Sequence, residues 1–127
     1  MATIKSYTDL DQSKKLARIL PLESADMYWW SSGKRYYIEA MDDGDFNEEE
    51  GHIRAWSLAA LLEQLPYELC DDDGNSTYIQ MNKDDNLYQL VYTEPYDNFE
   101  SIETNRYKHF IDACYELILK LYELNLL

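Results

Sequence analysis

The last stretch of the chain, 103–124, most limits how the protein can fold. Apolar residues recur there three, four and seven positions apart, which is the spacing of one buried helix face. The stripe consists of Tyr107, Phe110, Ile111, Cys114, Leu117, Ile118, Leu121 and Leu124, with no glycine or proline among them. A stripe this wide needs a broad surface to cover, most naturally a sheet. The sequence therefore predicts a long C-terminal helix, capped by Thr104 or Asn105, that packs on a β-sheet.

Two β-hairpins are predicted to supply that sheet. The segments 27–30 and 35–41 are rich in aromatic and branched residues and flank a short turn that contains Gly33. A second pair, 77–82 and 87–93, flanks the turn Lys83-Asp84-Asp85-Asn86. Helices near 8–20 and 57–65 precede the two hairpins, and each ends at a proline. The segment 52–56 reads either as a short strand or as the lead into the second helix.

These elements predict an α+β fold with the order α-β-β-α-β-β-α. The two hairpins are expected to merge into one antiparallel sheet of about four strands, packed against the long C-terminal helix. A length of 127 residues suits one domain, 1–127, because domains cluster at roughly 100–150 residues. The hydrophobic share of 46% indicates a folded core despite the high charge.

Charge and cysteine content limit the partners and the compartment. Twenty-five acidic residues against eleven basic ones give a net charge of −14, which repels phosphate backbones and anionic membranes. We therefore expect neither direct binding to nucleic acid nor attachment to a membrane. Cys70 and Cys114 form no metal-binding motif, and free thiols suit a reducing compartment. The N-terminus shows no apolar leader segment, so the expected location is the cytoplasm.

The sequence contains no recognisable catalytic, cofactor-binding or metal-binding constellation. His109 and Cys114 lie five residues apart, which separates them by about 140° around a helix. Glu39 is a carboxylate on a strand among tyrosines, and we interpret it as an outward polar residue. The acidic loops around Gly44 and Gly74 fail the spacing of a calcium-binding EF-hand loop, although weak calcium binding by their oxygen atoms stays open.

Aromatic residues are the most suggestive functional feature, with twelve tyrosines and three tryptophans. Helices on one face of a sheet can cover only half of the aromatic residues that the hairpins carry. If the long helix covers the face with Ile38, Ile79 and Val91, a set of tyrosines lies on the open face, where a partner protein or a second copy of the chain could dock. These candidate partner-binding residues are Tyr37, Tyr78, Tyr88 and Tyr92.

Two other functions are compatible with the sequence. Carboxylates in a continuous ridge could imitate DNA phosphates and inhibit a nucleic-acid-binding protein. The acidic residues available for such a ridge are Asp42, Asp43, Asp45, Glu48, Glu49, Glu50, Asp71, Asp72 and Asp73. Alternatively, a small-ligand protein or an enzyme would need a pocket between sheet and helices, near Glu39 or His109.

Two segments resemble a known group of proteins. LARILPLESADMYW at 16–29 and AWSLAALL at 55–62 are similar to a group of small acidic bacterial proteins of unknown function that occur in phage and other mobile elements. The resemblance implies a bacterial, cytoplasmic setting and an accessory or inhibitory role, and it brings no catalytic residues. Together with the aromatic surplus, it favours a non-enzymatic module that binds another protein.

Overall fold

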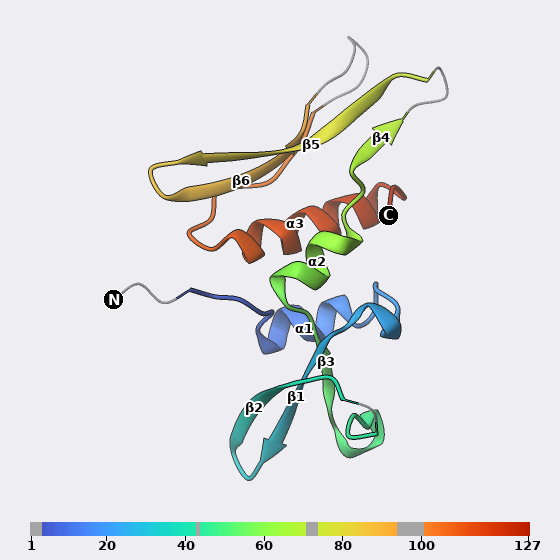
Figure 1. Cartoon of the computed structure of the whole chain (residues 1–127), viewed down its shortest axis with the longest axis vertical. Coiled ribbons are helices and arrows are strands. Elements are labelled where there is room, and N and C mark those ends of the chain that lie inside the picture. The colour runs from blue at the N-terminus through green and yellow to red at the C-terminus, as the bar shows by residue number, and fades with distance from the viewer. Residues whose placement is uncertain (1–3, 43, 71–73, 94–100) are drawn as a thin grey trace. The chain divides into compact units, whose positions relative to one another are not determined.

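Both predicted hairpins form in the computed structural model, but they belong to two different sheets (Figure 1). The structure describes residues 4–42, 44–70, 74–93 and 101–127. Contacts divide the chain into an N-terminal unit, Ser6–Leu61, and a C-terminal unit, Leu62–Leu127 together with the start of the chain up to Lys5. The α+β class with antiparallel sheets is confirmed, whereas the expectation that the two hairpins merge into one sheet is wrong. The single-domain organisation stays a prediction.

The N-terminal unit contains a three-stranded sheet in the order β2-β1-β3. The central strand β1 (Met27–Ser32) pairs antiparallel with both β2 (Arg35–Ala40) and β3 (Ile53–Ala55). Gly33 begins the turn between β1 and β2 with a φ of +64°, a backbone region that glycine adopts without steric cost. The segment that read either as strand or as helix lead is thus a short strand, and it leaves β2 at the outer edge of the sheet.

Helix α1 (Leu10–Leu16) packs on β3 in the same unit. Its N-terminus is closed by a capping box, in which the Asp9 carboxylate accepts the Gln12 backbone N–H at 2.8 Å and the Gln12 side chain accepts the Asp9 N–H at 3.1 Å. Two single turns of 3₁₀ helix, η1 (Leu22–Ser24) and η2 (Glu48–Glu50), occupy the connections on either side of the hairpin.

The C-terminal unit contains the predicted combination of a four-stranded antiparallel sheet and the C-terminal helix (Figure 1). The strands lie in the order β4 (Glu68–Cys70), β5 (Ser76–Asp84), β6 (Leu87–Tyr92) and β7 (Ile102–Glu103). Helix α3 (Phe110–Glu123) packs against β6. All four strands come from the second half of the chain, so β4 and β7 take the places that the sequence assigned to the first hairpin.

Helix α3 begins later than the apolar spacing predicts. Residues before it pair with β6 instead, since the N–H groups of Tyr88 and Tyr107 each donate to the carbonyl of the other at 2.6 and 2.8 Å. His109 becomes the N-cap residue, without a side-chain hydrogen bond. From Ile111 to Leu121 the stripe is buried as expected, whereas Phe110 is half-buried and Leu124 is exposed after the end of the helix. The buried residues of α3 are Ile111, Ala113, Cys114, Leu117, Ile118 and Leu121.

Candidate partner-binding surface

Two aromatic side chains stack across β1 and β2 in the N-terminal unit. Trp30 lies opposite Tyr37 in the strand register, and their ring centroids are 4.8 Å apart with an interplanar angle of 28°. Tyr37 remains 40% exposed. The indole Nε1 of Trp30 is buried, yet it has no hydrogen-bond partner among the described residues. A buried donor without an acceptor costs about 1–3 kcal/mol, so the packing of this N–H is locally destabilising.

A third aromatic residue, Tyr28, lies on the same face of the sheet, opposite Glu39 of β2. Its hydroxyl donates to Glu39 Oε2 at 3.1 Å, and its ring stacks on His52 at 5.1 Å. Burial raises the pKa of Tyr28, and the nearby carboxylates of Glu39, Asp45 and Asp42 raise it further. These three carboxylates therefore gather near the carboxyl-terminal end of β2 and make that corner of the unit locally negative.

Strand β2 presents its two tyrosines on opposite faces of the sheet. Tyr36 is 46% exposed and shares a face with Trp29 and Ile38, whereas Tyr37 shares a face with Trp30. Because β2 is an edge strand, the two rings bracket an unpaired edge. We call Trp30, Tyr36 and Tyr37 the β2 edge surface. The sequence pattern identified Tyr37 as a candidate but assigned Tyr36 to the helix-covered face.

The C-terminal unit carries another exposed aromatic pair. Tyr78 on β5 is 48% exposed, and its ring centroid lies 5.2 Å from that of Tyr67, which is 74% exposed. The negative charge of Glu68, the residue opposite Tyr78 in the register, raises the pKa of Tyr78. The sequence predicted Tyr78 as exposed. It gave no reason to single out Tyr67, because that residue follows Pro66 at what read as a helix end.

The expectation that Tyr88 and Tyr92 lie on an open face is wrong. The register pairs Ile79 with Tyr92, so Ile79 shares its face of the sheet with Tyr88 and Tyr92, and Val91 lies on the other face. Tyr92 is fully buried and donates from its hydroxyl to the Pro66 carbonyl at 2.5 Å. Tyr88 is half-buried, with its ring centroid 5.6 Å from that of Phe110 on α3.

Removing the Tyr92 hydroxyl should therefore affect stability and leave association unchanged. Tyr92→Phe keeps the ring but strips the Pro66 carbonyl of its donor, which should lower the free energy of unfolding by about 1–2 kcal/mol. Tyr78→Phe is the matched control. Because Tyr78 is exposed, this substitution should change the free energy of unfolding by no more than about 0.5 kcal/mol. Urea unfolding of both variants measures the difference, and equal losses would contradict the buried role of Tyr92.

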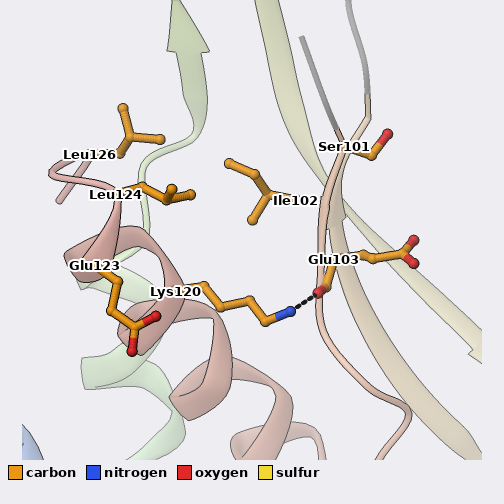
Figure 2. A pocket seen from close by; sticks show the side chains of 7 residues that line it. All are labelled: Ser101, Ile102, Glu103, Lys120, Glu123, Leu124 and Leu126. Carbon is orange, nitrogen blue, oxygen red and sulfur yellow. Dashed lines mark hydrogen bonds between the residues drawn. The ribbon is translucent and has the colours of Figure 1, made fainter.

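An open hollow lies between the end of α3 and β7 (Figure 2). Its volume is about 520 Å³, and its residues are Ser101, Ile102, Glu103, Lys120, Glu123, Leu124 and Leu126. Lys120 Nζ donates to the Glu103 carbonyl at 2.6 Å, as Figure 2 shows, and lies 3.9 Å from the Glu116 carboxylate. The ammonium group of Lys120 is therefore already bound by groups of the protein, so this hollow is poorly suited to an anionic ligand.

A second hollow of about 390 Å³ lies beside α1 in the N-terminal unit, where it includes Lys14, Arg18 and Arg54. Arg54 is held by Glu48 through a bond of 2.8 Å from Nε to Oε1. Neither hollow includes Glu39 or His109, the two residues that would have marked a catalytic pocket. Neither hollow is therefore the pocket near Glu39 or His109 that the sequence analysis required of an enzyme or small-ligand protein.

The candidate acidic residues divide between described and undescribed parts of the chain. The side chains of Asp42, Asp45, Glu48, Glu49 and Glu50 are all exposed, which fits solvated loops. The remaining four, Asp43, Asp71, Asp72 and Asp73, lie outside the described residues, so the continuous ridge of a DNA mimic stays a prediction. Within the described ranges, no three His, Cys, Asp or Glu side chains gather closely enough to hold a metal ion.

Comparison with known proteins adds no relative. No family model matches the chain, and neither a similar curated protein nor a similar solved structure was found. Among the described residues, no helix has both the length and the apolar character needed to cross a membrane. A functional interpretation therefore rests on the exposed surfaces of the two units.

Proposed function

We propose that the protein is a non-enzymatic module that binds another protein through the β2 edge surface. The observation that carries this proposal is the Trp30–Tyr37 stack, in which an exposed tyrosine lies on a half-buried tryptophan at the edge of the sheet. Tryptophan and tyrosine dominate binding hot spots because they bury much area and carry a polar group. A partner that packs on Tyr37 and on the exposed part of Trp30 would cover both rings.

The proposed setting is the cytoplasm. Cys70 is exposed and Cys114 is buried, and both are free thiols. An exposed free cysteine persists best where glutathione keeps thiols reduced. This supports an intracellular partner, and it directs the search for that partner to extracts prepared under reducing conditions.

Replacing Tyr37 should remove partner binding with little effect on folding. Tagged wild-type protein is used to capture partners from a reducing extract of the organism that encodes it, and each recovered protein is then purified for affinity measurements. Tyr37→Ser should weaken the affinity at least tenfold, because an aromatic hot spot contributes about 2 kcal/mol or more. The free energy of unfolding should fall by about 1 kcal/mol or less, the range of one aromatic pair.

Tyr122→Ser is the matched control for this experiment. Tyr122 is a similarly exposed tyrosine, at 52%, near the end of α3 in the other unit. The control should bind the partner with wild-type affinity. Equal affinity for all three proteins, or recovery of no partner that distinguishes them, would refute the proposed role of the β2 edge surface.

A further inference from the structure

We propose that the outer edge of β2 receives an extended, lysine- or arginine-rich segment of the partner as an additional strand. This inference rests on the proposed function and specifies both the binding mode and the chemistry of the partner. Among the strands that the structure describes, β2 pairs only with β1, and it forms the outer edge of the sheet in Figure 1. An open edge offers a row of backbone donors and acceptors, which is the basis of recognition by strand addition.

The direction of the free backbone groups follows from one hydrogen bond. The Met41 N–H donates to the Asp26 carbonyl at 2.9 Å, on the side of β1. The N–H and C=O groups of one residue in an antiparallel ladder point to the same side, and that side alternates along the strand. The groups of Tyr37 and Glu39 therefore point toward β1, whereas those of three residues point outward: Tyr36, Ile38 and Ala40.

The side chains next to this edge indicate the charge of the segment. The Glu39 carboxylate accepts a hydrogen bond from the Tyr28 hydroxyl at 3.1 Å, and the exposed Asp42 and Asp45 follow the end of β2, which places a negative corner at the Ala40 end of the strand. Glu39 shares its face of the sheet with the Trp30–Tyr37 stack. Carboxylates beside aromatic rings suit a lysine or arginine side chain, since the cation gains both an ion pair and a cation–π contact.

The opposite end of β2 fixes where the cation sits. Lys34 and Arg35 lie at the turn, so a basic residue of the partner is repelled there and attracted at the Ala40 end. On the other face of the edge, Tyr36 and Ile38 favour apolar residues of the added strand. The fitting segment therefore alternates basic and apolar residues.

A second copy of this chain is a poor occupant of the same edge. Two copies would bring net charges of −14 together, and the negative corner of one edge would meet an equally acidic protein. A basic partner is drawn toward the same field, which also accelerates association at low salt. Charge complementarity thus selects a basic segment over self-association.

Hydrogen exchange measured by NMR on the ¹⁵N-labelled protein tests strand addition directly. The probe is a capped seven-residue peptide of alternating lysine and valine, and the matched control peptide alternates glutamate and valine. At saturation the lysine peptide should slow amide exchange at least tenfold at Tyr36, Ile38 and Ala40. Exchange at Tyr37 and Glu39 should not change, because their N–H groups already face β1. A lysine peptide with N-methylated backbone amides should not produce this protection.

Two variants of the protein separate edge pairing from charge. Ala40→Pro removes an outward N–H while leaving the bonds to β1 in place, because an edge strand tolerates proline where the N–H faces solvent. It should weaken binding of the lysine peptide at least tenfold. Asp42→Asn should weaken it several-fold, whereas Glu123→Gln, which makes the same change of charge on α3, should leave it unchanged.

The outcomes distinguish this inference from the proposed function. Protection confined to the three outward amides, with the expected order of the variants, supports strand addition. If the lysine peptide does not bind, or if the glutamate peptide protects the same amides equally, the proposal of a basic partner is overturned. Binding without protection of these amides overturns strand addition. In each of these failures, a captured partner that still depends on Tyr37 would leave the protein-binding function standing.

Discussion

The protein is expected to lose stability steeply as the pH rises from 9 to 12. Burial raises the pKa of the Cys114 thiol from 9.0 to about 12 and that of the Tyr92 hydroxyl from 10.0 to about 12. The unfolded chain releases these protons above pH 9 and pH 10, whereas the native protein retains them to about pH 12. Deprotonation therefore favours the unfolded state, by up to about 1.4 kcal/mol per pH unit and group.

For Cys114 alone this amounts to about 4 kcal/mol over three pH units, against a total stability of about 5–15 kcal/mol for a typical domain. Urea midpoints followed by circular dichroism at pH 8, 9, 10 and 11 measure the slope. Cys114→Ala is the control, since it lacks the thiol and should begin to lose stability only near pH 10. If the urea midpoints of the wild type and of Cys114→Ala changed in parallel between pH 9 and 10, the Cys114 thiol would not contribute to the pH dependence of stability.

Periodicity predicted the elements of the protein better than their pairing. The stripe from Ile111 to Leu121 is buried as expected, because helix spacing depends only on local sequence. The start of α3 was missed because Tyr107 fits the helical stripe equally well, yet it pairs with Tyr88 across the sheet. Whether Tyr107 joins the helix or the sheet depends on Tyr88, which lies 19 positions away in the sequence. A local pattern contains no information about such a distant contact.

The same reason explains which candidate tyrosines are exposed as expected and which are not. Alternation along β2 separates Tyr36 from Tyr37 without knowledge of any other strand. Placing Tyr88 and Tyr92 required the register between β5 and β6, which is set by the turn at Asp85 and Asn86. Both turn residues adopt positive φ, 49° and 64°, as a two-residue type I′ turn requires. The sequence interpretation assigned four residues to this turn, which shifts the register by two residues and leaves every side chain on its own face. Tyr88 and Tyr92 were misplaced because Ile79 was grouped with Val91, whereas the register puts Ile79 on the face of Tyr88 and Tyr92.

The unsatisfied Trp30 indole could not be found from sequence at all. Burial of an N–H group without an acceptor depends on every atom around it, whereas composition records only that a tryptophan is present. The open edge of β2 was also hidden, because the expected merger of the two hairpins gave no reason to single out this edge. Recognition of the edge depended on the strand order β2-β1-β3.

Truncating Trp56 should cost the N-terminal unit most of its stability. Trp56 is fully buried, and its indole Nε1 donates to Ser24 Oγ at 2.9 Å. Its backbone also joins β3 to the start of α1, since the Trp56 N–H donates to Thr8 Oγ1 at 3.1 Å and the Thr8 N–H donates to the Trp56 carbonyl at 2.9 Å. Trp56→Ala leaves a large cavity where these elements meet, and substitutions of this kind cost about 3–5 kcal/mol.

Trp56→Phe distinguishes loss of volume from loss of the hydrogen bond. Phenylalanine fills much of the cavity but cannot donate to Ser24, whose own hydroxyl still donates to the Pro21 carbonyl at 2.6 Å. Its cost should therefore be smaller, about 1–3 kcal/mol. Urea unfolding followed by circular dichroism gives both values. If the alanine and phenylalanine variants lost the same stability, the indole N–H and not the ring volume would hold this junction together.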